Sequence, residues 1–127
     1  MNCKVKVRAK VNPTEDLDKV IKAISNIFDY DELEIGEGYV VVTGDKDSLL
    51  KLKDELKNRK IRDTANKVLY KGVENHKINF SLGKQAALVH VPNFVDSQMS
   101  SLGEIDVEIE TDNTDQFIAW ITQKQQE

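Results

Sequence analysis

The sequence predicts one α+β domain in which about four helices pack on a mixed, mostly antiparallel sheet. Apolar residues alternate with polar ones in several short segments, as in half-buried strands, and recur at three- and four-residue steps in others, as in amphipathic helices. The predicted order of elements is β-α-β-β-α-α-β-β-β-α. Because the chain has 127 residues and no low-complexity linker, residues 1–127 are expected to form a single domain.

The first strand is predicted over residues 4–11, where cations alternate with small apolar residues. Its cations are Lys4, Lys6, Arg8 and Lys10. A helix is expected directly after it, with Asn12 as the N-cap, Pro13 at the first helical position and Glu15 at the capping-box position. Apolar residues from Leu17 to Phe28 follow a helical period and should cover the sheet.

The next segment predicts a hairpin. Residues 33–35 and 39–43 have the composition of strands, and Gly36-Glu37-Gly38 between them suits a tight turn. The same glycines do not form a phosphate-binding loop, because a strand follows them and such a loop needs a helix N-terminus. Asp45 or Asp47 is expected to cap the following helix.

That helix is predicted to break near Asn58, because its apolar phase would otherwise bury Lys60 and Asp63. A second helix is expected over residues 61–69. Gly72 should end it in the left-handed conformation that follows many helices.

The last third of the chain is expected to contain three more strands and a helix. The first two strands are predicted over residues 78–82 and 86–91, with a turn between them and Pro92 as the stop. A surface loop is expected at 96–101. The third strand, 105–109, alternates aliphatic residues with carboxylates, and Asp112 is expected to cap the final helix.

Charge is unevenly distributed along the chain. The net charge is −4, but residues 46–77 hold ten Lys/Arg and five Asp/Glu, whereas residues 93–127 hold one and eight. Any anion-binding surface should therefore come mainly from the middle of the chain.

The composition also argues against several classes of protein. No apolar run approaches the ~20 residues that cross a bilayer, and the N-terminus alternates instead of forming the apolar block of a secretory signal, so a cytoplasmic location is expected. The single cysteine, Cys3, excludes an internal disulfide, and His76 and His90 lack partners at metal-ligand spacing. No metal, cofactor or catalytic centre is predicted.

The cations of the first strand have two explanations. They could follow successive RNA phosphates, or they could face the carboxylates at 104–110 on an adjacent antiparallel strand. We favour the second explanation, because cross-strand pairs of opposite charge contribute about 0.2–1 kcal/mol each.

The central cations also have two explanations, and the sequence does not decide between them. Lys53, Lys57 and Lys60 share a helical face, and Arg59 and Arg62 stand at the predicted break. They could form an anion-binding surface, or they could be ordinary solvated helix faces, since acidic residues are interspersed among them. One further polar set, Asp63, Thr64, Lys84 and Gln85, would mark a small-molecule pocket if the fold brought it together.

Five stretches of the sequence resemble an archaeal family of uncharacterised conserved proteins classed as RNA-binding. They are Val11-Asn12-Pro13-Thr14-Glu15-Asp16, Ile61-Arg62-Asp63-Thr64-Ala65, residues 80–87 with Lys84-Gln85, Asn93-Phe94, and residues 102–107. The resemblance implies a fold similar to the ribosomal protein that binds the small RNA of the large subunit, and no known enzyme activity. The chain departs from the family pattern at Gly83, Asn66 and 90–92, which removes two phosphate contacts.

We therefore expect a non-enzymatic protein that contacts RNA by charge and shape, without cofactor, membrane or small-molecule substrate. The expected RNA-binding residues are Lys53, Lys57, Arg59, Lys60, Arg62, Lys84 and Gln85. The alternative is a homodimeric protein-interaction or scaffold module in which one strand edge pairs with a second copy.

Overall fold

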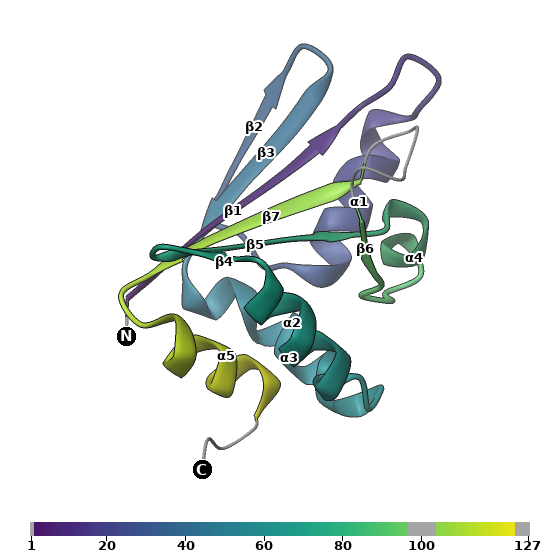
Figure 1. Ribbon diagram of the computed structural model, residues 1–127. Coiled ribbons are helices and arrows are strands. Elements are labelled where there is room, and N and C mark those ends of the chain that lie inside the picture. The colour runs from purple at the N-terminus through teal and green to yellow at the C-terminus, as the bar shows by residue number, and fades with distance from the viewer. Residues whose placement is uncertain (1, 97–103, 124–127) are drawn as a thin grey trace.

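The computed structural model describes residues 2–96 and 104–123 and contains one sheet with helices packed against it (Figure 1). Its strands are β1 (Cys3–Lys10), β2 (Glu32–Gly36), β3 (Tyr39–Gly44), β4 (Val73–Glu74), β5 (Lys77–Leu82), β6 (Phe94–Val95) and β7 (Ile105–Thr111). Its α-helices are α1 (Leu17–Ile27), α2 (Leu50–Asn58), α3 (Arg62–Lys71), α4 (Lys84–Leu88) and α5 (Thr114–Thr122), and a 3-10 turn, η1 (Lys46–Leu49), precedes α2.

The strand order is β2-β3-β1-β7-β5-β4, and β6 pairs with β5 beside β4. Each of the pairs is antiparallel. The predicted α+β class and the break between α2 and α3 are confirmed. The turn at Gly36-Glu37-Gly38 is also confirmed, and Gly38 adopts the positive φ of 79° that such a turn favours.

The helices cover one face of the sheet. Along β1, β5 and β7, buried residues alternate with more exposed ones, as expected when only one face packs against a second layer. The buried side chains of the sheet meet apolar residues of the helices in one core, which includes Val7, Ile24, Leu56, Leu69 and Phe117. The other face of the sheet carries mostly polar side chains.

The predicted pairing of the basic and acidic strands is confirmed. β1 lies beside β7 with Lys4 opposite Glu110, Lys6 opposite Glu108 and Arg8 opposite Asp106. Among the described residues of these strands, the ion pair within bonding distance joins β7 to β5, its neighbour on the other side. Lys77 Nζ of β5 lies 2.9 Å from Glu108 Oε1 of β7. Its hydrogen bond to Glu108 raises the pKa of Lys77.

The start of α1 differs from the prediction. The helix begins at Leu17 with Asp16 as its N-cap, four residues after Asn12. Asn12 instead donates its backbone N–H to Glu15 Oε1 at 3.0 Å, within a turn that precedes the helix. Glu15 stays in this turn because it is also bonded to Lys84, far along the chain.

The prediction of a strand over residues 86–91 was wrong. Residues Lys84–Leu88 form the short helix α4, and the strand at this end of β5 is β6. Ala and Leu favour helix, and a short apolar run carries no period that separates helix from strand. Asn26 of α1 stabilises α4 by donating to the carbonyls of Ala87 and Leu88 at 3.0 and 3.2 Å.

Two helix ends also differ in detail. Asn113, not Asp112, caps α5, since its side chain accepts from the backbone N–H of Gln116. Gly72 ends α3 as predicted, but with a φ of −88° and not in the left-handed region. Most of the loop predicted at 96–101 lies outside the described residues. Within the described segments, no helix is both long enough and apolar enough to cross a membrane.

Candidate nucleic-acid interface

The turn between α2 and α3 brings four of the predicted cations together. Lys60 N–H donates to the Lys57 carbonyl at 3.2 Å, and Ile61 N–H donates to the Leu56 carbonyl at 3.1 Å. This pair of bonds is the Schellman arrangement that closes many helices. Leu56 and Ile61 both pack on the core, so the turn is anchored from below.

Lys60 occupies the position of this motif that usually holds glycine. Its φ is 58°, in the left-handed region, where a residue with a Cβ is disfavoured by about 1–2 kcal/mol. A cation is therefore held at a strained backbone position. Strain of this kind recurs at functional sites.

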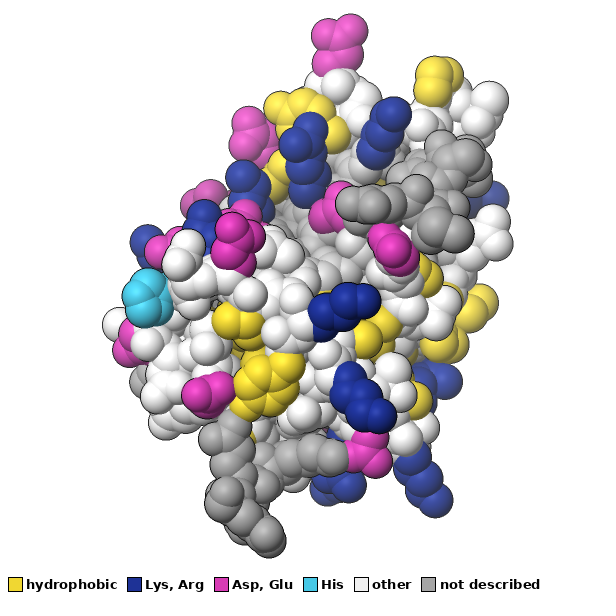
Figure 2. Space-filling model, in the orientation of Figure 1, with side chains coloured by type: hydrophobic (Ala, Val, Ile, Leu, Met, Phe, Trp, Pro, Cys, Tyr) yellow, Lys and Arg dark blue, Asp and Glu magenta, His cyan; other side chains and the backbone are white. Residues whose placement is uncertain are grey.

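The four cations Lys57, Arg59, Lys60 and Arg62, called the basic turn below, differ in exposure. The first three are exposed and Arg62 is half-buried at the start of α3. No acidic residue occurs between positions 57 and 62. Figure 2 shows dark-blue side chains at the lower right of the view, where Figure 1 places this turn.

Arg59 connects the basic turn to the end of α4. Its Nε lies 2.6 Å from Glu55 Oε2, one helical turn earlier, and its Nη2 donates to the His90 carbonyl at 3.3 Å. α4 ends in the same Schellman arrangement: His90 N–H donates to the Ala87 carbonyl, and Val91 N–H donates to the Ala86 carbonyl. His90 has a φ of 64°. Two helix C-termini, which favour nearby cations, therefore meet at Arg59.

Sequence reasoning missed His90 as a neighbour of this surface. It assigned residues 86–91 to a strand, and a helix end cannot be predicted where no helix is expected. The only signal was Pro92, which often follows a helix C-terminus as well as a strand.

Lys53 stands apart from the basic turn. Its Nζ lies 5.3 Å from the ring centroid of Trp120 in α5, and Lys46 Nζ lies 4.6 Å from the same ring. Both are cation–π contacts. Lys53 thus helps dock α2 on α5.

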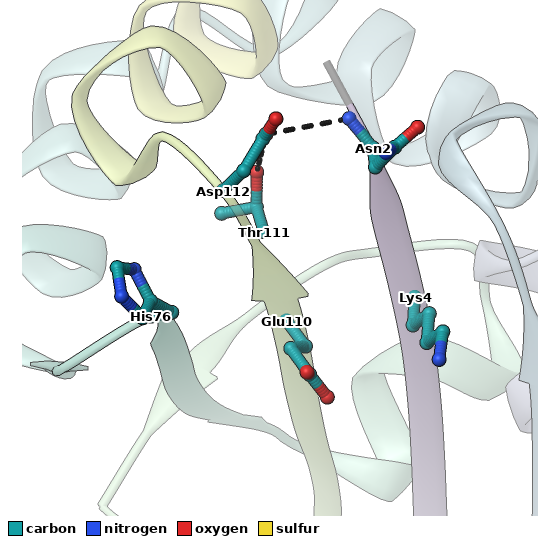
Figure 3. A pocket seen from close by; sticks show the side chains of 6 residues that line it. All are labelled: Asn2, Lys4, His76, Glu110, Thr111 and Asp112. Carbon is teal, nitrogen blue, oxygen red and sulfur yellow. Dashed lines mark hydrogen bonds between the residues drawn. The ribbon is translucent and has the colours of Figure 1, made fainter.

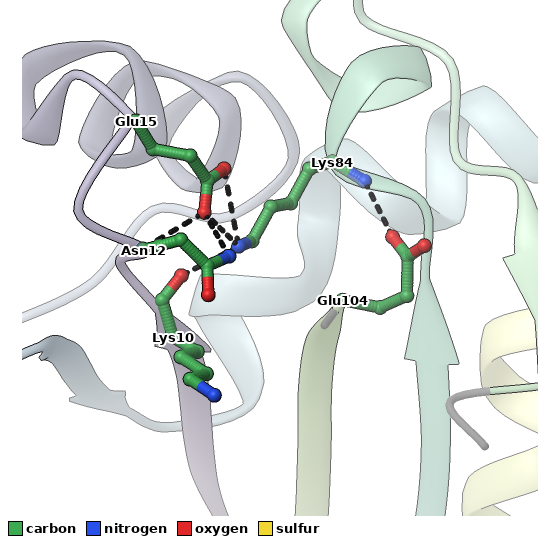
Figure 4. Close-up of polar contacts among 5 residues, drawn as sticks. All are labelled: Lys10, Asn12, Glu15, Lys84 and Glu104. Atoms are coloured by element: carbon green, nitrogen blue, oxygen red, sulfur yellow. Dashed lines mark hydrogen bonds and ion pairs between the residues drawn. The ribbon is translucent and has the colours of Figure 1, made fainter. Parts of the chain in front are cut away.

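Lys84 is buried and is not part of the basic turn. Figure 4 shows its polar contacts. Its side chain is 9% exposed, and its Nζ donates to the Lys10 carbonyl and lies 3.0 Å from Glu15 Oε1. Its backbone N–H donates to Glu104 Oε2 at 3.0 Å. Lys84 therefore fastens α4 to the end of β1 and to the turn before α1.

The same contacts govern Glu15. Burial by itself would raise the pKa of this carboxyl, but hydrogen bonds from Asn12 and Lys84 outweigh burial and lower it. Glu15 was expected at the capping-box position of a helix capped by Asn12. Its part in the contact with Lys84 could not be predicted from residues 69 positions apart.

The polar set Asp63, Thr64, Lys84 and Gln85 does not form one pocket. A pocket of about 260 Å³ does contain Lys84 and Gln85, but apart from Leu88 of α4 its other lining residues come from α1 and the turn before it. Asp63 and Thr64 are exposed on α3 and do not line it. The set that would have suggested a small-molecule enzyme is thus divided.

Another pocket, of about 340 Å³, lies at the end of β1 and β7 and contains His76 (Figure 3). Its carboxylates already have neighbours: Glu110 faces Lys4 across the sheet, and Asp112 accepts from the backbone N–H of Asn2 at 3.3 Å. In the described parts of the chain, no three His, Cys, Asp or Glu side chains are grouped so as to hold a metal ion.

Both the sequence and the fold of the chain match a known family. The model of a family described as RNA binding matches residues 4–111. The chain is 42% identical to a UPF0201 protein of Methanothermobacter thermautotrophicus, over 93% of this chain and 89% of the relative. It is also 42% identical to a UPF0201 protein of Saccharolobus solfataricus, over 95% and 88%. The chain therefore belongs to the UPF0201 family of archaeal proteins, as its sequence predicted.

Solved structures agree. The crystal structure of an uncharacterised UPF0201 protein covers 94% of this chain and 92% of its own, with 34% identity and a TM-score of 0.83. A UPF0201 protein from Methanococcus jannaschii covers 94% and 98%, with 36% identity and a TM-score of 0.77. The expected likeness to the ribosomal protein stays a prediction.

Proposed function

We propose that the protein binds RNA through the basic turn, with Lys57, Arg59, Lys60 and Arg62 contacting phosphates. The family match supports a role in RNA binding. The observation that carries the choice of surface is Lys60, a lysine at a strained left-handed position where glycine would relieve the backbone. The strain is understandable if the charge at this position is used.

The open face of the sheet is a weaker candidate, because its charges balance. The four cations of β1 and Lys77 of β5 are matched by three carboxylates of β7 and by Glu32 and Glu34 of β2. Some of these cations are also engaged: Arg8 lies 5.0 Å from the ring centroid of Tyr39, and Lys77 is paired with Glu108. A neutral face gains little from counterion release.

The contacts are expected to be with phosphates more than with bases. Recognition of single strands usually needs aromatic rings on which bases stack. Trp120 lies beneath two lysines, and Tyr70 is 37% exposed on α3. A phosphate-binding turn suits a double-stranded or hairpin RNA, whose backbone follows a regular shape.

The test compares two pairs of substitutions with the same change in charge. Lys57→Glu with Lys60→Glu removes exposed cations of the basic turn, and Lys19→Glu with Lys22→Glu removes exposed cations of α1. Affinity for an RNA hairpin and for a single strand of equal length is measured by fluorescence anisotropy at low salt.

We expect the substitutions in the basic turn to weaken hairpin binding at least tenfold, roughly the loss from two phosphate contacts. The α1 substitutions should change affinity about threefold or less, through overall charge alone. Equal losses in both variants would overturn the choice of surface. Failure of the unaltered protein to bind either RNA would overturn the proposed function.

A further inference from the structure

We propose that the free edge of β2 binds an extended segment of a partner protein in which Lys or Arg alternates with aliphatic residues. β2 is the last strand of the sheet and has β3 as its neighbour on one side only, within the described residues. Glu32, Leu33, Glu34 and Ile35 are all exposed. Such an edge offers unpaired backbone groups to an added strand.

The apolar side chains of β2 lie on the same face of the sheet as the core but are not covered by the helices. Leu33 lies opposite Val42 and Ile35 lies opposite Val40, and both valines are buried. Leu33 is nevertheless 43% exposed and Ile35 53% exposed. An added strand with aliphatic residues opposite these two would continue both rows.

The acidic side chains of β2 lie on the opposite face and have no cation beside them on β3. Glu32 is opposite Thr43, and Glu34 is opposite Val41. β7 alternates carboxylates and aliphatic residues in the same way, and there the cations of β1 stand opposite the carboxylates. The sheet therefore contains an example of the strand that would suit β2, namely residues 4–10.

A second copy of the chain is a poor occupant of this edge. Antiparallel pairing of two β2 strands centred on Glu34 places that carboxylate against itself, and centring on Leu33 places Glu32 against Glu34. Like charges directly opposite each other are destabilising. A basic strand avoids this repulsion. A second copy centred on Ile35 also avoids it, but that register places Leu33 against Glu37 and brings no cation to Glu32 or Glu34.

RNA is also a poor occupant. Residues 29–37 contain five acidic residues and no cation, and of these only Asp29 has an ion pair among the described residues, with Lys51 at 2.9 Å. Magenta side chains follow the upper-left edge in Figure 2, where Figure 1 places β2. This acidic edge would repel phosphates, so β2 and the basic turn suit different partners.

The experiment uses a synthetic peptide with the sequence of residues 4–10, KVKVRAK, blocked at both ends. It is titrated into the full-length, isotope-labelled protein, and amide shifts are followed by NMR. The control peptide carries Glu in place of each Lys and Arg. A further protein variant, Glu32→Lys with Glu34→Lys, is compared with Asp54→Lys with Glu74→Lys, which alters two exposed carboxylates elsewhere.

The expected result is a saturable shift confined to β2 and β3 with the basic peptide and none with the acidic one. Affinity should fall at least tenfold in Glu32→Lys with Glu34→Lys and stay within about twofold in the other variant. The proposal is overturned if the peptide shifts other strands, if both variants respond alike, or if nothing binds. It is also overturned if the RNA hairpin shifts β2, or if the unaltered protein is a dimer that the peptide dissociates.

Discussion

Two basic segments of this protein differ in how far carboxylates neutralise their charge. In β1, Lys4, Lys6 and Arg8 each stand opposite a carboxylate of β7, about a hundred residues later in the chain. In the basic turn, only Arg59 has an ion pair within the described residues, with Glu55 on its own helix. The number of cations therefore says little about anion binding until the strand register shows which carboxylates face them.

Lys84 is the extreme case of a neutralised cation, and removing it should have the largest effect. Lys84→Met leaves Glu15 half-buried without its cation, and we expect the free energy of unfolding to fall by about 3 kcal/mol. Urea denaturation measures the loss. Gln85→Met, at the exposed neighbour, should change stability by less than about 0.5 kcal/mol. A small effect of Lys84→Met would mean that the ion pair between Lys84 and Glu15 does not stabilise the fold.

Stability should depend on pH through the same ion pair. Because the folded protein lowers the pKa of Glu15, the ionised carboxylate stabilises the fold above the ordinary pKa of glutamate. Glu15→Gln should therefore cost about 2 kcal/mol at neutral pH. This difference should shrink as pH falls below the ordinary value and disappear once pH passes the lowered pKa. Denaturation at several pH values measures it, with the exposed Glu37→Gln as control.

Salt dependence of RNA binding compares the two basic segments directly. Lys57→Gln with Lys60→Gln should reduce the slope of log affinity against log salt by about 1.5, or about 0.7–0.9 for each lost phosphate contact. Lys4→Gln with Lys6→Gln should leave the slope almost unchanged, because their charges are matched by β7. If the β1 variant loses as much slope as the other, the open face of the sheet also contacts RNA.

Reversing charge on β7 tests the neutralised segment. Asp106→Lys with Glu108→Lys puts like charges across β1 and β7, so stability should fall by about 1 kcal/mol. The same change removes the carboxylate that pairs with Lys77. Adding Lys6→Glu and Arg8→Glu should recover about half of that loss. No recovery, measured by thermal unfolding, would indicate that the cross-strand charges do not interact.

The smallest predicted effect separates strain from charge at Lys60. Lys60→Gly should raise the free energy of unfolding by about 0.5 kcal/mol, because the gain at positive φ exceeds the entropy cost of glycine. The same change should weaken RNA binding through the lost charge. Lys57→Gly, in the regular part of α2, should instead lower stability by about 1 kcal/mol. A destabilising Lys60→Gly would remove the main argument for this surface.

The sequence predicted an element correctly where a periodic pattern of apolar and polar residues extended over several residues. The alternation in β1 and β7 predicted both strands and their pairing, because charge and period agreed over seven residues of β7. The break at Asn58 was equally visible, since the helical phase would have buried charges there.

The errors have a common physical origin in contacts between distant residues. Asn26 of α1 caps the five-residue helix α4, and Lys84 holds Glu15 outside α1. Neither contact leaves a local pattern. Because α4 was predicted as a strand, the contact between His90 and Arg59 could not be predicted either. The sequence therefore predicted the cations of the basic turn but not their neighbour.

The stacking of Lys46 and Lys53 on Trp120 gives the protein a built-in optical reporter. Trp120 is the only tryptophan of the chain, and two ammonium groups lie over its ring. Its emission should therefore respond when either lysine leaves the ring for a phosphate. Fluorescence during an RNA titration would show whether contacts that begin at the basic turn continue along α2 as far as Lys53, without any label on the protein.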